Sequence, residues 1–163
     1  MTYPPIRYHG DGERSATLRR ADDPHDLVYP SGTTVDYLAT HASTDGLFGI
    51  YRWSMPGTGG PGPHFHRTMT ESFYVLVGRI TIYDGTEWRE CGPGDFVHVP
   101  MGGIHGFRND SGAFASMLIH FAPGAPREGY FEGNARFAAE GRPSKEVMDA
   151  FYAEHDNVWL AED

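Results

Sequence analysis

The stretch HFHRTMTESFYVLVG, residues 64–78, places two histidines and a glutamate directly ahead of a run of apolar and aromatic residues. Side chains two positions apart on a strand point to the same face, so His64 and His66 can direct both imidazoles at one point. Glu71 has the parity of Phe73 on the strand that follows. If that face is interior, the carboxylate is a buried charge that requires a partner or a metal.

A third histidine, His105, lies just past the turn formed by residues 100–102. Three imidazoles and one carboxylate suit Fe, Mn, Co, Ni, Cu or Zn. A closed structural zinc site would use thiolates, and Cys91 is the single cysteine. The sequence therefore indicates one divalent transition-metal ion, whose identity the donor set leaves open.

The sequence around this cluster is typical of short strands separated by turns. Val35, Tyr37 and Ala39 alternate with their neighbours, and the pair Asp84-Gly85 favours a hairpin turn. Regular spacing of such strands predicts an antiparallel sandwich or barrel. Further strands are expected over residues 47–53, 71–77, 80–83, 87–90, 95–99 and 114–121.

The chain ends on a different pattern, with helical spacing over residues 127–139 and a second helix starting at Pro143-Ser144. Ser144 is the expected N-cap of that helix. We predict a single domain over residues 1–163. Its parts are an N-terminal arm (1–32), a β core (33–122) and a helical tail (123–163).

The composition excludes several classes of protein. The 163 residues can bury a hydrophobic core, and the formal net charge of -9 makes nucleic acid an unfavourable partner. No run of about 18 apolar residues exists, so no membrane span is expected. Residues 1–10 lack the apolar stretch of a signal peptide, and Cys91 has no second cysteine for an internal disulfide. The expected location is the cytoplasm.

Two motifs of this sequence resemble those of the cupins. The first cupin motif reads G-x5-H-x-H-x3-4-E-x6-G, and only its leading glycine is replaced, by Thr58 between two glycines. The second reads G-x5-P-x-G-x2-H-x3-N and is matched throughout. The matching residues are His64, His66, Glu71 and Gly78 in the first motif, and Gly94, Pro100, Gly102, His105 and Asn109 in the second.

The resemblance covers about residues 47–121, and it implies an all-β jelly-roll barrel with the C-terminal helices packed outside. It also implies a homodimer and a metal ion inside the barrel, bound by His64, His66, Glu71 and His105. The tail after Pro123 resembles that of small bacterial cupins related to quercetin dioxygenase.

An apolar, aromatic-lined cavity is expected around the metal. Phe73, Val75 and Phe107 share the parity of ligands on their strands and are candidate walls. The facing of the strand near residue 50 stays open. Either Tyr51 and Trp53 or the alternate set of Phe48, Ile50 and Arg52 would join the cavity.

Three functions fit these features. The first is a metal-dependent dioxygenase acting with O2 on a small aromatic or enolic, flavonol-like substrate, with Glu71 as a ligand and a general base. The second is a redox-neutral isomerase, decarboxylase or polyketide cyclase that uses the metal as a Lewis acid. The third is a non-catalytic binding or sensing module. Sensory cupins often carry a DNA-binding domain, for which this chain has no room. Oxygen dependence separates the first two.

Overall fold

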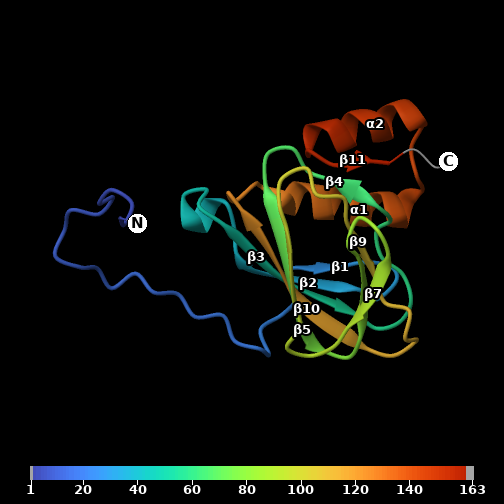
Figure 1. The fold of residues 1–163 in the computed structure, drawn as a ribbon, viewed down its shortest axis with the longest axis horizontal. Coiled ribbons are helices and arrows are strands. Elements are labelled where there is room, and N and C mark those ends of the chain that lie inside the picture. The colour runs from blue at the N-terminus through green and yellow to red at the C-terminus, as the bar shows by residue number, and fades with distance from the viewer. Residues whose placement is uncertain (1, 161–163) are drawn as a thin grey trace.

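The structure is a computed structural model that describes residues 2–160 of the chain. Most of the described elements are strands, and two helices follow them near the C-terminus (Figure 1). The strands are β1 (Leu27–Val28), β2 (Thr34–Ala39), β3 (Gly49–Met55), β4 (His64–Phe65), β5 (Thr70–Val77), β6 (Ile80–Tyr83), β7 (Trp88–Cys91), β8 (Phe96–Val99), β9 (Gly106–Arg108), β10 (Ala115–Ala122) and β11 (Val158–Trp159). The helices are α1 (Arg127–Glu140) and α2 (Lys145–Glu154), and a 3-10 turn spans Ala42–Thr44.

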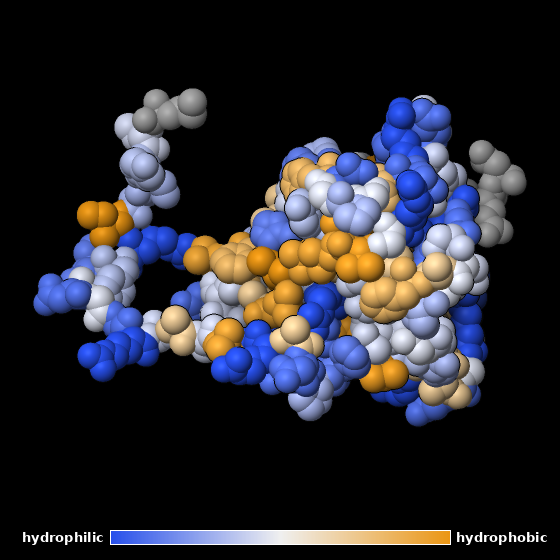
Figure 2. Space-filling view, turned by 90° about the horizontal axis from the view of Figure 1, so that it is seen from below, coloured by the Kyte–Doolittle hydropathy of each residue, from blue (hydrophilic) through white to orange (hydrophobic). Residues whose placement is uncertain are grey.

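The strands form three antiparallel sheets. The largest has the order β1-β2-β3-β10-β5-β8, and the others are β7-β6-β9 and the pair β11-β4. In β5, Glu71, Phe73 and Val75 point inward and are buried, whereas Tyr74 and Leu76 point outward and are exposed. Figure 2 shows hydrophobic residues gathered in a band on one outer face of the molecule. The alternation of buried and exposed residues in β5 matches the period of two that the sequence predicts for a strand, and it identifies the inner face of the largest sheet.

A glycine makes the sharp connection between β5 and β6 possible. Gly78 has φ of 72°, a left-handed conformation that side chains rarely adopt. A Cβ at this position would lie 2.4 Å from the carbonyl oxygen of Phe114. Both constraints require glycine here, which explains the residue that closes the first motif.

The helices lie at one end of the sheets, next to β4 and β11 (Figure 1). Ser144 caps α2 as expected, because its hydroxyl accepts a hydrogen bond of 3.4 Å from the Val147 amide. Helix α1 is more than an outer cover, since Phe131 packs edge-on against Tyr51 and Trp53, with ring centroids 5.1 and 5.2 Å away. The helices therefore lie outside the sheets, as expected, and the aromatic face of α1 is buried against the core.

The N-terminal arm is largely exposed and without regular structure up to β1, and Figure 1 shows it extending away from the sheets. The predicted domain includes residue 1 and residues 161–163, which lie outside the described residues. Within residues 2–160, neither helix is long and apolar enough to span a membrane.

Candidate metal centre

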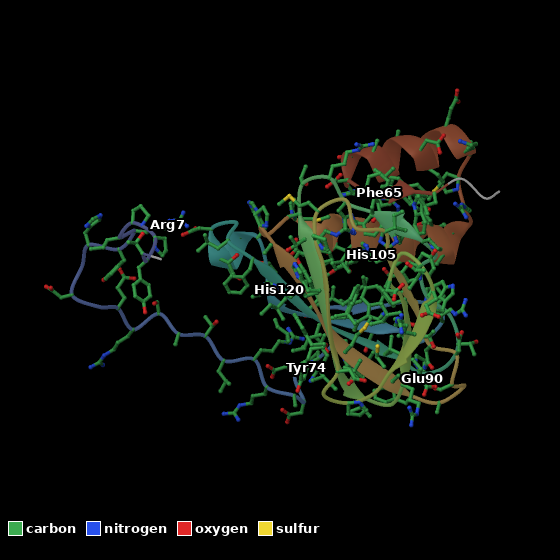
Figure 3. All side chains as sticks on the ribbon, viewed as in Figure 1. Arg7, Phe65, Tyr74, Glu90, His105 and His120 are labelled. Atoms are coloured by element: carbon green, nitrogen blue, oxygen red, sulfur yellow. The ribbon has the colours of Figure 1, made fainter. Side chains whose placement is uncertain are left out.

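The four residues of the predicted site come together between the sheets. One ligand atom from each of His64, His66, Glu71 and His105 can be chosen so that all lie within 4.8 Å of one another. All four side chains are buried, and Figure 3 shows His105 inside the fold near the C-terminal helices. The fold thus brings together four residues that are separated by 2, 5 and 34 positions in the sequence.

Backbone pairing places the histidines. His64 begins β4 and forms a bridge with His105, in which each amide donates to the other's carbonyl over 2.8 Å. Strand β4 ends at Phe65, so His66 lies just beyond it, yet its ring centroid is 5.1 Å from that of His64. Glu71 reaches the cluster from β5.

Each imidazole is oriented by a hydrogen bond from its Nδ1 to a backbone carbonyl. The acceptors are Gly62 for His64 at 2.9 Å, Asp156 for His66 at 2.6 Å and Gly103 for His105 at 2.9 Å. A carbonyl oxygen only accepts, so each Nδ1 carries its ring's proton. In a neutral imidazole this leaves Nε2 with a free lone pair, the arrangement found in metal-binding histidines.

The carboxylate faces two of these nitrogens. Glu71 Oε2 lies 2.9 Å from His66 Nε2 and 2.8 Å from His105 Nε2. Because Nδ1 already holds the proton, neutral rings would direct two lone pairs at an anionic oxygen. An additional positive charge among these atoms, from a proton or a metal ion, resolves the repulsion. The donor set, its burial and its hydrogen bonds therefore fit a divalent transition metal.

The pKa shifts in the cluster follow from burial and mutual charge. Burial and the neighbouring His105 lower the pKa of His64 to about 3, so this ring stays neutral. Burial disfavours the charged forms of His105 and Glu71, but their contact outweighs it. The pKa of His105 is raised, and that of Glu71 lies well below its usual range. An ionised carboxylate and a neutral imidazole are the states that bind metal.

A cavity of about 390 Å³ opens from this cluster, with His64 and Glu71 in its wall. The remaining wall is mainly apolar and aromatic, which suits a flat organic ligand. Its aromatic lining residues are Tyr29, Trp53, Phe107, Phe121, Tyr130, Phe131, Tyr152 and Trp159.

The predicted wall residues divide between this cavity and the core. Trp53 and Phe107 line the cavity, with ring centroids 5.9 Å apart. Tyr51, Phe73 and Val75 are buried in the core cluster and are not among the lining residues. They have the inward parity expected, but they pack between the sheets, away from the cavity surface.

Burial and side-chain contacts show which way the side chains of β3 face. Tyr51 and Trp53 point inward, and Arg52 points outward, where its Nε donates to Asp36 over 2.7 Å. Ile50 shares the outward parity, and Phe48 precedes the strand.

Several residues at the site carried no signal in the sequence. Asp156 orients His66 through its carbonyl, and its carboxylate accepts from the amides of Arg67 and Thr68. Trp159 lies 5.0 Å from His64 between ring centroids, because β11 pairs with β4. These contacts join residues about 90 positions apart in the sequence. No local sequence pattern predicts a strand as short as the two residues of β11.

Comparisons with known proteins agree with the fold. Residues 52–129 match the family described as a cupin domain. Quercetin 2,3-dioxygenase of Bacillus subtilis (strain 168) is 31% identical over 121 residues, which make up 74% of this chain and 32% of that protein. This chain therefore spans about a third of the length of that relative.

Two solved structures are similar over most of their own length. The polyketide cyclase RemF from Streptomyces resistomycificus has a TM-score of 0.56 and 26% identity, covering 68% of this chain and 81% of the cyclase. KdgF from Halomonas sp. has a TM-score of 0.58 and 17% identity, covering 68% of this chain and 96% of KdgF. The likeness to KdgF is one of fold.

Proposed function

The chain belongs to the cupin superfamily, and from this premise we propose that it is a metal-dependent dioxygenase of a small aromatic or enolic substrate. The observation that carries the proposal is the buried cluster of three imidazoles and one carboxylate at the wall of an aromatic cavity. Similarity to quercetin 2,3-dioxygenase supports the choice of reaction. We also propose that the sheets form the jelly-roll barrel of the superfamily.

His64, His66, Glu71 and His105 would hold the ion. A divalent transition metal bound there would supply Lewis acidity and, if redox-active, reactivity toward O2. The three backbone carbonyls that accept from Nδ1 hold the rings in position before any ligand enters.

Residues of the cavity would bind the substrate and accept its proton. The aromatic wall, including Trp53 and Phe107, would stack on a flat substrate and exclude water from it. Glu71 is the one carboxylate among the lining residues of the described chain, so it would accept the proton of the substrate hydroxyl. Its low pKa, set by His105 and His66, makes this a weak base and favours acidic enols or phenols as substrates.

The experiment is a screen for oxygen uptake with flavonols and other enols, using protein whose metal content has been measured. Glu71→Gln keeps the size of the side chain and removes its charge, so it should reduce uptake by at least about a hundredfold. Conversion of substrate without O2 would reject the dioxygenase and favour the second function. Saturable binding without turnover, under any metal, would favour a binding module.

A redox-neutral cyclase or isomerase is the second candidate. The observation in its favour is the similarity to the polyketide cyclase RemF, most of whose length this chain covers. Only a third of the dioxygenase is covered. In this reading, the same four ligands would hold a Lewis acid that polarises a carbonyl.

We further propose that the chain forms a homodimer through the outer face of the largest sheet. Tyr74, Leu76 and Phe96 point outward there and are 42%, 36% and 63% exposed. Burial of such a face on a second copy is favourable. Sedimentation should give a dimer for the natural chain and a monomer for Phe96→Glu. A monomeric natural chain would refute this proposal.

The cytoplasmic location stays a prediction.

A further inference from the structure

Arg127 is a buried guanidinium in the wall of the same cavity as His64 and Glu71. Its side chain is 3% exposed, and it is the first residue of α1. The acceptors that the described chain offers it are neutral, namely the His155 carbonyl at 2.7 Å and Asn157 Oδ1 at 3.3 Å. An arginine is charged at any accessible pH, so a buried one without an anionic partner is costly.

Aromatic rings offset part of this cost. The guanidinium carbon lies 4.1 Å from the ring centroid of Tyr130, and 5.1 and 5.6 Å from those of Phe121 and Phe131. Cation–π contacts of this kind stabilise the charge but satisfy no N–H donor. Arg127 Nε has no hydrogen-bond partner among residues 2–160.

A second donor without a partner lies in the same wall. Trp159 Nε1 is buried and has no acceptor within the described chain, although an indole N–H can only donate. Trp159 lines the cavity with Arg127, and its ring is 5.0 Å from that of His64. Two of the four buried side-chain nitrogens left without partners in residues 2–160 thus line one cavity. Buried donors of this kind require acceptors.

The charge of the cavity also favours a ligand that supplies acceptors. Glu71 is its one acidic lining residue in the described chain. A divalent ion held by that carboxylate would leave one positive charge, to which Arg127 would add a second. A low-dielectric cavity with this excess favours an anionic ligand.

We infer that Arg127 and Trp159 select an aromatic substrate that carries a negatively charged oxygen group, such as a carboxylate or enolate. The anionic oxygen accepts from Arg127 Nε and Trp159 Nε1, while the rings of the cavity wall contact the flat body of the substrate. This inference rests on the proposed function, because it names the class of substrate for that site. Arg127 is a specificity-determining residue in this account.

The test compares binding of 2-naphthoate with that of its neutral counterpart 2-naphthamide, by calorimetry on protein of known metal content. The natural chain should bind 2-naphthoate at least about tenfold more tightly, as expected for charge-assisted hydrogen bonds. Arg127→Met should abolish the preference and leave the metal content unchanged. The matched control is Arg136→Met, an exposed arginine on the same helix, which should keep the preference.

Trp159→Phe retains a ring and removes the N–H, so it tests the inference even if Arg127→Met fails to fold. It should weaken 2-naphthoate binding several-fold and 2-naphthamide binding less, because a carboxylate is a stronger acceptor than a neutral amide oxygen. Equal affinity for the two probes, or no binding of either, would overturn the inference. A preference that survives Arg127→Met in a folded protein would also overturn it, since the carboxylate would then be bound by the metal. Metal content is measured separately, so a chain without metal would refute the proposed function and leave an Arg127-dependent preference standing.

Discussion

Two buried carboxylates, Glu71 and Asp36, lie on opposite faces of the largest sheet and are neutralised in different ways. Asp36 is fully buried and accepts from Arg52 Nε and His25 Nδ1, both at 2.7 Å, with Arg19 at 3.5 Å. The chain thus provides Asp36 with permanent cations. Among residues 2–160, the hydrogen bonds of the Glu71 carboxylate go only to imidazoles, whose Nδ1 atoms donate to backbone carbonyls.

Asp36 is thus a structural carboxylate, whereas the surroundings of Glu71 suit a carboxylate that binds a ligand. An arginine brings a charge that neither pH nor metal supply alters. An imidazole is neutral or charged depending on its surroundings, and its neutral form binds metals. Glu71 and its histidines therefore form a cluster that a bound cation could neutralise. The cluster around Asp36 obtains its cations from the chain itself.

The largest difference should appear in metal content. His105→Ala removes a proposed ligand, so the metal bound per chain should fall at least about tenfold. Asp36→Asn should not change it, and neither should His9→Ala at an exposed histidine. Elemental analysis of the purified variants measures this. Equal metal content in His105→Ala and in the natural chain would contradict the role of His105 as a metal ligand.

Removal of the metal should lower the melting temperature of the natural chain by on the order of 10 °C. The reason is that a ligand bound only by the folded state stabilises it by about 4 kcal/mol at 1,000 times its Kd. Calorimetry before and after chelation measures the shift. His105→Ala should show almost none, and a shift of the same size in that variant would place the stabilising metal elsewhere.

Asp36→Asn should lower the free energy of unfolding by about 2 kcal/mol, because the arginines and His25 lose a buried anionic acceptor. Urea titration at neutral pH measures this, with Asp110→Asn as the control. Asp110 pairs with Arg108 but is half exposed, so its loss should change stability little. Equal effects of the two substitutions would contradict the structural role of Asp36.

The smallest effect concerns pH. Burial raises the pKa of Asp36, but hydrogen bonds and charge from His25 and Arg52 outweigh burial and bring it below its usual value. Its contribution is therefore complete above the unfolded pKa near 4 and is lost as the pH falls through the lower folded value. The stability difference between the natural chain and Asp36→Asn should shrink below about pH 4. A constant difference from pH 6 to pH 3 would refute this.

The sequence predicted best what depends on local periodicity. The parity of β5 put Glu71 and Phe73 on one inner face, and the two motifs named the residues that the fold brings together. The ion cluster around Asp36 was not predicted, because its partners come from the N-terminal arm and from β3. No strand pattern distinguishes an arginine that points toward a buried acid from one in solvent.

The two helices of the tail and the Ser144 cap were predicted correctly from local spacing. Spacing does not say which face of the β core the helices cover. The contributions of Arg127, Asp156 and Trp159 to the site arise from the position of α1 and from the two-residue strand β11. Such contacts depend on the closure of the whole fold, and they became visible only in three dimensions.

Glu71 and the three histidines are proposed to hold one metal ion. The most direct measurement is the metal content and identity of untagged protein purified without chelator or nickel resin. The account predicts about one transition-metal ion per chain, lost in His105→Ala and kept in Asp36→Asn. A natural chain that holds no metal, even after incubation with iron, manganese, nickel, cobalt, copper or zinc salts, would contradict it.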